Sequence, residues 1–477
     1  MKKIFILNPP SPFFTDKNRY LRQMANSLPS VGICSLGGMM KSRSWTVSLL
    51  DAAALGLTLP ETVAAIERFQ PHILGISMYS NAVHIIRKLV TMIKARYQDM
   101  LIIIGGPHVS AVQERLFEAV NIKADFAVLG EGEITLAELA TVLAGGNDVS
   151  QVPGILYQNR GRWQKTTARK NVVELDQLPD PAWELLPGFP HRYQPPIFSY
   201  TRGPAAPLIT SRGCPYHCAF CDHSVFGYHY RVHSTARIVA MVRTLHQKHG
   251  VNHILFADDH LSLNEKRLTA LCHAFIDEEI AVNWSADVRA DSLSVEHLML
   301  MKQAGCVRIN CGIETGSPEL LKKMKKGLNL AHVKNTLRWA HILGIQTKGL
   351  FMVGFPGENN TTIRETLALL KNLEVTEINV SKFAPYPGTP FYEKLRGPRT
   401  DSSYWRYLDG TNFCDPDLNR IRWLEKKYYQ ILHTFYARPR IINTYLVLLL
   451  KYADSRKRLF SFFRDFFKIK LGLKKGF

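Results

Sequence analysis

The feature that most constrains the fold is an alternation of short apolar segments with longer amphipathic ones, which occurs in two stretches of this 477-residue chain. Apolar runs of about four to eight residues predict buried strands, and longer segments with helical periodicity predict helices. Strands that alternate with helices along a chain form parallel sheets. The sequence therefore predicts an α/β protein with two such sheets.

The first stretch, residues 1–150, has the pattern of a doubly wound domain, and the second, residues 201–395, has six β/α units. Residues 151–200 are rich in proline and turn residues and predict a linker. Residues 396–477 predict a helical C-terminal region with a basic amphipathic tail. Strands are expected at 4–7, 46–50, 74–77, 101–104, 126–129, 207–210, 254–256, 283–286, 308–311, 347–352 and 377–383, with long helices at 32–43, 82–96, 424–435 and 439–453.

Three cysteines, Cys214, Cys218 and Cys221, follow the first strand of the second stretch with the spacing C-x3-C-x2-C. Three thiolates this close together can hold three irons of a cubane iron–sulfur cluster and leave the fourth iron open. Structural zinc is the alternative, but it needs four ligands, and only His217 and His223 lie near enough to complete the set. The spacing favours a cluster.

This spacing, with Phe220 just before the last cysteine, resembles the radical S-adenosylmethionine superfamily. The resemblance implies a [4Fe-4S] cluster whose open iron binds S-adenosylmethionine and whose electron cleaves it to a 5′-deoxyadenosyl radical. It implies a partial (β/α)6 TIM-type barrel over 201–395, with cluster and substrate at the carboxyl ends of the strands. It also implies an external electron donor such as flavodoxin or ferredoxin.

Polar and glycine residues follow the predicted barrel strands, where the resemblance implies contacts with S-adenosylmethionine. A carboxylate can pair with its amino group, an arginine with its carboxylate, and a glutamate with its ribose hydroxyls. Helix capping by the aspartates, a surface salt bridge of the arginine and a turn at the glycine are the alternatives. No residue is assigned to the chemistry of the substrate. The expected contacts are Phe220, Asp258, Asp259, Ser285, Arg289, Glu314 and Gly354.

The first 145 residues resemble the cobalamin-binding domain that precedes many radical enzymes, which is Rossmann-like. The resemblance rests on Gly75-Ile-Ser77, Gly105-Gly-Pro-His108 and Gly130-Glu-Gly-Glu133. The loop after the first strand, Asn8–Pro12, has no histidine. This departure implies either base-off cobalamin without a histidine ligand or a domain that no longer binds cobalamin. The implied cobalamin contacts are Ser77, Gly105, Gly106, His108, Gly130 and Glu131.

Together the two resemblances imply a radical enzyme that performs cobalamin-dependent methyl transfer to an unactivated carbon. A non-methylating reaction, such as the oxidative cyclisation of a tetrapyrrole by the anaerobic porphyrin E-ring cyclase, is an alternative. A cobalamin or iron–sulfur sensor is an alternative of another class. A methylthiotransferase is excluded, because its second cluster needs three N-terminal cysteines and only Cys34 precedes the motif.

The formal charge of +20 brings no nucleic-acid-binding signature with it, so we expect no nucleic acid partner. Basic residues and phenylalanines alternate in the tail 456–477, which suits an amphiphilic or anionic substrate. The tail is either a helix at the membrane interface or a terminal helix packed on its own domain. The expected localisation is cytoplasmic, with the first alternative placing the tail at the inner membrane face. The apolar face of this helix would hold Leu459, Phe463, Phe466, Phe467 and Leu471.

The remaining five cysteines have no framework spacing and are expected to be small buried side chains. They are Cys34, Cys272, Cys306, Cys311 and Cys414.

Overall fold

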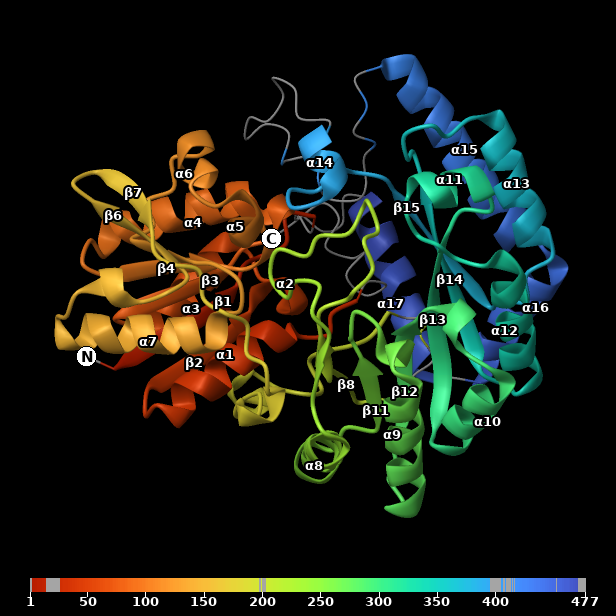
Figure 1. Cartoon of the computed structure of the whole chain (residues 1–477), viewed down its shortest axis with the longest axis horizontal. Coiled ribbons are helices and arrows are strands. Elements are labelled where there is room, and N and C mark those ends of the chain that lie inside the picture. The colour runs from red at the N-terminus through yellow and green to blue at the C-terminus, as the bar shows by residue number, and fades with distance from the viewer. Residues whose placement is uncertain are drawn as a thin grey trace.

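The computed structural model describes residues 2–13, 26–196, 199, 203–394, 405, 408, 413, 415, 417–451 and 453–470. Cys414 and Leu471 lie outside this part of the chain, as do the side chains of Phe466 and Phe467. Two lobes lie side by side, the first coloured red to yellow in Figure 1 and the second green to blue. Each lobe is built around one largely parallel sheet, so the predicted α/β fold class is confirmed.

The first sheet has seven strands in the order β2-β1-β3-β4-β5-β6-β7. Its strands are β1 (Lys3–Asn8), β2 (Thr46–Asp51), β3 (Ile73–Ser77), β4 (Leu101–Gly105), β5 (Phe126–Val128), β6 (Ile155–Asn159) and β7 (Arg162–Lys165). Its helices are α1 (Val31–Ser42), α2 (Ala52–Leu55), α3 (Leu59–Phe69), α4 (Val83–Arg96), α5 (Pro107–Val112), α6 (Arg115–Ala119) and α7 (Gly132–Gly145).

Strands β1 to β5 of this sheet are parallel, and the strand order reverses direction at β1, which lies between β2 and β3. Ligands of doubly wound sheets bind at such a switch point, beyond the carboxyl ends of the strands. The hairpin β6–β7 continues the sheet in antiparallel fashion into residues where the sequence indicated only a linker. Its strands are short, and Ile155 and Leu156 are the only buried residues in them, so they lack the apolar run that reveals a buried strand.

The second sheet has six parallel strands in the order β15-β14-β13-β12-β11-β8. They are β8 (Ala205–Leu208), β11 (His253–Phe256), β12 (Asn283–Val288), β13 (Cys306–Glu314), β14 (Gln346–Val353) and β15 (Glu377–Lys382), and a separate antiparallel pair consists of β9 (Ser211–Arg212) and β10 (Arg231–Val232). The helices are α8 (Thr235–Arg243), α9 (Glu265–Asp277), α10 (Val295–Gln303), α11 (Pro318–Lys323), α12 (Leu330–Ile342), α13 (Asn360–Lys371) and α14 (Pro390–Lys394). Pro207 is accommodated because β8 is the edge strand of the sheet.

The C-terminal region contains three helices, α15 (Leu418–Tyr436), α16 (Pro439–Lys451) and α17 (Ala453–Lys470). Ile442, Leu446 and Leu450 form an exposed apolar stripe on α16, and Phe463 of α17 is also exposed. No described helix is both long and apolar enough to cross a membrane. Contact of the tail with a membrane surface stays a prediction.

The linker between the two sheets packs against both lobes. Gly38 of α1 allows this close approach, because a Cβ at this position would lie 2.1 Å from the carbonyl oxygen of Asp180. On the other side, the Asp180 carboxylate pairs with Arg237 of α8 at 2.8 Å, and Asp176 contacts His233 at 2.8 Å. The linker therefore fixes the orientation of the lobes.

A buried ion network also joins the lobes. Arg212 of β9 and Arg231 of β10 are paired residues of the short antiparallel ladder. Arg212 Nη2 lies 2.6 Å from Glu133 Oε1, and Arg231 Nη1 lies 2.7 Å from Glu131 Oε1, both at the start of α7 in the first lobe. All four side chains are at least nine-tenths buried. The network therefore ties the first lobe to the strand pair that flanks the cysteine loop.

We expect Glu133→Leu to lower the free energy of unfolding by about 3 kcal/mol, because removing one partner of a buried ion pair strands the other charge. The double variant Arg212→Leu/Glu133→Leu should lose less than the sum of the single variants. Urea denaturation of the anaerobically purified proteins measures both effects.

The matched control is the pair Lys41–Glu184, which has the same length of 2.6 Å but side chains that are 60% and 43% exposed. Glu184→Leu should change the free energy of unfolding by less than about 1 kcal/mol. Equal losses in Glu133→Leu and Glu184→Leu would contradict the role assigned to the buried network.

Candidate active site between the two lobes

The cysteine loop, residues 213–230, leaves the end of β9 and returns through β10. Cys218 is buried, and Cys214 and Cys221 are half-buried. A hydrogen bond with the Cys221 thiol, aided by the charges of Lys326 and Arg289, lowers the pKa of Cys218 to about 6. The same hydrogen bond raises the pKa of Cys221. A thiolate is the form that binds iron, so this pair lies in a setting suited to a metal cluster.

The two aspartates that follow β11 both hold the base of the cysteine loop. Asp258 is buried and accepts hydrogen bonds from the backbone N–H and hydroxyl groups of Thr210 and Ser211. Asp259 accepts one from the backbone N–H of Gly213 at 3.2 Å and also lines a cavity. Of the two predicted contacts with S-adenosylmethionine, Asp259 thus faces open space, whereas Asp258 supports the loop.

A second group of charged side chains lies beside the cysteine loop. Glu314, at the end of β13, pairs with Lys326 at 3.0 Å and has a φ of +66°. A non-glycine residue in this region is strained, and such strain concentrates at functional sites. Arg289 stacks over the ring of Tyr216 at 4.3 Å and binds Asp291 and the Lys326 carbonyl.

The remaining predicted contacts differ in how closely they already contact other residues of the protein. Ser285 is buried and shares a hydrogen bond of 2.9 Å with His253. Phe220 packs on an apolar cluster and lies 5.6 Å, ring centroid to Nζ, from Lys326. Gly354 has a φ of +98°, and a Cβ here would lie 2.9 Å from the ring of Phe413. The fold itself therefore requires glycine at this position, independently of any contact with a ligand.

A cavity of about 340 Å³ opens between the first lobe and the cysteine loop. Five of the six residues predicted to contact cobalamin line it, namely Ser77, Gly105, Gly106, Gly130 and Glu131. The cysteine loop contributes His223, Val225 and Phe226 to the facing wall. The cavity lies at the switch point of the first sheet, since Ile6 of β1 and Gly75 of β3 are also in its lining.

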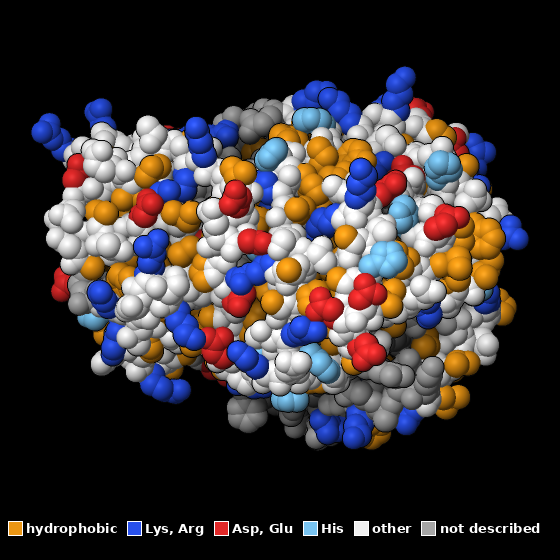
Figure 2. Space-filling view, turned by 60° about the horizontal axis from the view of Figure 1, so that its bottom comes forward, with side chains coloured by type: hydrophobic (Ala, Val, Ile, Leu, Met, Phe, Trp, Pro, Cys, Tyr) orange, Lys and Arg blue, Asp and Glu red, His pale blue; other side chains and the backbone are white. Residues whose placement is uncertain are grey.

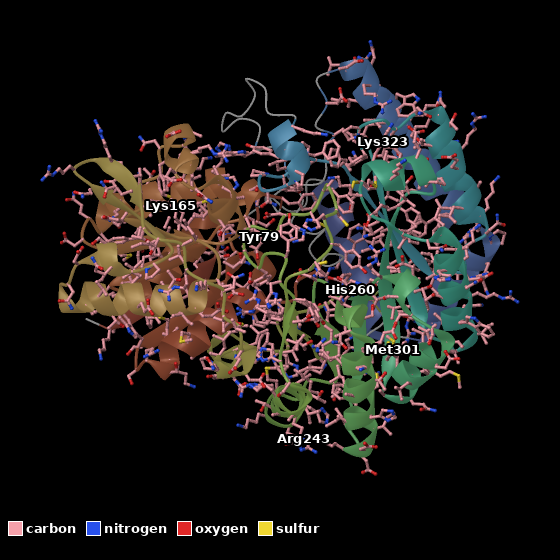
Figure 3. The ribbon with its side chains drawn as sticks, in the orientation of Figure 1. Tyr79, Lys165, Arg243, His260, Met301 and Lys323 are labelled. Carbon is pink, nitrogen blue, oxygen red and sulfur yellow. The ribbon has the colours of Figure 1, made fainter. Side chains whose placement is uncertain are left out.

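The sixth residue, His108, lines a neighbouring cavity of about 730 Å³ instead. Its Nδ1 lies 2.9 Å from the hydroxyl of Ser80, and its ring packs edge-on against Trp405. Burial lowers the pKa of His108 to about 3, so the ring is neutral. Tyr79, which lines both cavities, lies between the two lobes in Figure 3.

The lining of the smaller cavity leaves room for a ligand at the carboxyl ends of the first sheet. A Cβ on Gly75 would meet nothing closer than 3.9 Å, and one on Gly105 nothing closer than 3.5 Å, so both glycines leave space on the sheet. Gly106 and Gly130 have φ values of +106° and +71°, which favour glycine in the loops that approach a ligand.

The donor set of the cysteine loop fits an iron–sulfur cluster. Among the described residues, no three His, Cys, Asp or Glu side chains converge as the ligands of a single ion would. A cubane cluster does not need that convergence, because each thiolate binds a different iron. Lys326 and Arg289 supply positive charge beside the thiols, which suits the negative charge of a thiolate-bound cluster.

Comparison with known proteins agrees with this geometry. The model of the radical SAM superfamily matches residues 208–370, and that of the B12 binding domain matches residues 20–140. An uncharacterized methyltransferase from Pyrococcus horikoshii is 27% identical over 446 residues, 92% of this chain and 94% of its own length. An anaerobic magnesium-protoporphyrin IX monomethyl ester cyclase from Synechocystis sp. is 27% identical over 414 residues, 85% of this chain and 80% of its own length.

The chain belongs to the B12-binding radical S-adenosylmethionine family. Within this family it is a cobalamin-dependent radical enzyme, with support for a [4Fe-4S] cluster, S-adenosylmethionine and cobalamin as its cofactors. A radical S-adenosylmethionine methyltransferase from Kitasatospora setae, solved with cobalamin and a [4Fe-4S] cluster, has the same fold. Its TM-score is 0.70 at 18% identity, with 92% of this chain and 89% of that chain covered.

Gly75 and Lys326 were not among the predicted contacts, and the predicted roles of Asp258 and Asp259 were not separated. Gly75 carried a signal, because a glycine inside a buried strand often marks the close approach of a ligand. Lys326 gave none, because it stands in a run of lysines that is typical of solvated surface. Asp258 and Asp259 are adjacent in sequence, and only the three-dimensional structure separates their roles.

We expect Gly75→Leu to abolish cobalamin binding while the protein stays folded, because the new side chain occupies the cavity without a strained backbone. Cobalt analysis and the visible spectrum of protein loaded with cobalamin measure this. Iron content should be unchanged, and Gly75→Ala should bind cobalamin more strongly than Gly75→Leu does. Full cobalt retention in a folded Gly75→Leu protein would place cobalamin elsewhere.

We expect Cys218→Ala to lose the cluster but to keep cobalamin, because the described lining of the smaller cavity contains none of the three cysteines. Wild-type protein reconstituted anaerobically should contain about four irons per chain, as a cubane cluster requires. The matched control is Cys311→Ala, since burial raises the pKa of the Cys311 thiol to about 12 and it lies in the core. Iron loss from Cys311→Ala equal to that from Cys218→Ala would contradict the assignment.

Proposed function

We propose that this enzyme transfers a methyl group to an unactivated carbon in a reaction that uses both cobalamin and S-adenosylmethionine. The observation that carries the proposal is that the cavity suited to cobalamin opens directly onto the cysteine loop. Residues of the first lobe form one wall, and His223, Val225 and Phe226 form the other. A methyl donor bound there and a radical formed at the loop would face the same substrate.

The larger cavity is the proposed substrate site. It shares Ser30, Tyr79 and Ile209 with the smaller cavity and reaches Leu255 and Ala257 at the end of β11. Tyr386, in the loop after β15, lines it as well. Because it touches both the switch point of the first sheet and the carboxyl ends of the second, a substrate here would lie between the two cofactors.

When bound, the cluster supplies the electron that cleaves S-adenosylmethionine to a 5′-deoxyadenosyl radical, and cobalamin carries the methyl group. We propose that Asp259 holds the amino group of S-adenosylmethionine, since its carboxylate lies beside Gly213 at the base of the cysteine loop. Glu314 would accept hydrogen bonds from the ribose, with Lys326 keeping its carboxylate in place. The packing of Phe220 on Phe355, Phe383 and Phe391 would exclude water from this side.

The similarity to a methyltransferase over 92% of this chain supports methyl transfer. Oxidative cyclisation is the second candidate, because the cyclase from Synechocystis sp. matches 85% of the chain at the same 27% identity. The two reactions differ in one product. Methyl transfer from S-adenosylmethionine releases S-adenosylhomocysteine, whereas a cyclisation initiated by the radical releases 5′-deoxyadenosine alone.

We expect the cobalamin-loaded enzyme, reduced anaerobically with titanium(III) citrate, to form both S-adenosylhomocysteine and 5′-deoxyadenosine from S-adenosylmethionine. Mass spectrometry of both products measures the outcome. Gly75→Leu should lose S-adenosylhomocysteine but keep 5′-deoxyadenosine, and Cys218→Ala should do the opposite. Formation of 5′-deoxyadenosine without any S-adenosylhomocysteine would support cyclisation, and the absence of both from wild type would reject a radical enzyme.

A further inference from the structure

The proposed function needs an electron from an external donor protein for each cleavage of S-adenosylmethionine, and the inference here rests on it. One side of the cysteine loop, with His223, Val225 and Phe226, faces the smaller cavity, which we propose holds cobalamin. Its base is buried under Asp258. A donor protein must therefore approach the loop from another direction.

The loop comes close to the surface where it meets the segment after α11. The backbone N–H of Ala219, between Cys218 and Phe220, donates a hydrogen bond of 2.8 Å to the carbonyl of Met324. Met324 is the centre of the sequence Lys322-Lys323-Met324-Lys325-Lys326. The surface at these lysines is thus one hydrogen bond away from the backbone of the cysteine loop.

The lysines of this segment divide into two groups. Lys326 turns inward to Glu314, and its side chain is only 12% exposed. Lys322, Lys323 and Lys325 are exposed, and we call these three the lysine surface. Figure 3 shows Lys323 on α11, in the upper part of the second lobe.

Two of the three exposed lysines form no ion pair with the described residues. Lys323 forms an ion pair of 2.6 Å with Glu319 one turn earlier, whereas in the described part of the chain Lys322 and Lys325 have no such pair. The backbone beneath is rigid, because Leu320 and Met324 pack with Phe355 and Phe383. A fixed cluster of like charges on a packed support favours electrostatic docking over a merely solvated charge run.

Net charge alone does not select a docking surface on this protein. On the face in Figure 2, Lys and Arg side chains are spread widely, with Asp and Glu side chains among them. What distinguishes the lysine surface is its direct connection to the cysteine loop. An electron arriving there has a short bonded path through the Met324 carbonyl and Ala219 to Cys218.

We propose that the lysine surface docks a small acidic one-electron carrier protein of the flavodoxin or ferredoxin class. Complementary charges bring the two proteins together quickly and leave the complex weak enough to separate after transfer. The carrier's acidic rim would face Lys322 and Lys325, and its redox centre would lie over the segment that contacts Ala219. Docked there, the carrier would supply one electron to the cluster that Cys214, Cys218 and Cys221 would hold, and it would leave in its oxidised form.

The test compares two reductants in the same assay of 5′-deoxyadenosine formation by the reconstituted holoenzyme. One is reduced flavodoxin, and the other is dithionite, which needs no docking surface. For Lys322→Glu/Lys325→Glu we expect the flavodoxin concentration at half-maximal rate to rise about tenfold at low ionic strength. The difference should shrink as salt is added, because salt screens exposed charges. The rate with dithionite should equal that of wild type.

Two controls make the result specific. Lys322→Arg/Lys325→Arg keeps the charge and should restore the wild-type dependence on flavodoxin. Lys165→Glu makes the same kind of reversal on the first lobe, far from Lys323 in Figure 3, and should have no effect. An unchanged flavodoxin dependence in Lys322→Glu/Lys325→Glu, with normal activity on dithionite, would overturn the docking proposal alone. Failure of wild type with dithionite would overturn the proposed function itself, and the docking proposal with it.

Discussion

The arrangement of the active site depends on the buried pairs between Arg212, Arg231, Glu131 and Glu133. Arg212 stands two residues before Cys214, and the two glutamates open α7 at the wall of the smaller cavity. The same four side chains therefore set how far the cysteine loop lies from the floor of that cavity. A buried charge without its partner is costly, so these pairs fix the position of one lobe relative to the other.

Within the second lobe, further contacts hold the cysteine loop from several directions. Asp258 and Asp259 fix its base, Arg289 stacks on Tyr216, and the Met324 carbonyl binds Ala219. These contacts come from different β/α units of the second sheet, so the loop is placed by the whole lobe. A site built in this way can place a cluster accurately even though the loop itself has little secondary structure.

Much of the fold and part of the site could be predicted from the sequence. Apolar runs such as Leu101–Ile104 indicated the buried strands, and the cysteine spacing indicated the cluster loop. The hairpin β6–β7 was missed because its strands are short and have no long apolar run, and the ion network was missed because Arg212 and Glu133 are 79 residues apart. Predicted polar contacts such as Ser285 and Arg289 proved to be partly or fully engaged within the protein, which residue type and strand position do not reveal.

The formal charge of +20 includes cations in different settings, and only the structure distinguishes the buried ones from the exposed ones. Some cations, such as Arg212 and Lys326, are neutralised in buried pairs, and others form the lysine surface. The described lining of the larger cavity contains Asp51, Asp222 and neutral His108 but no lysine or arginine. Among the described residues, basic side chains thus stabilise buried ion pairs within the protein and also form a charged surface.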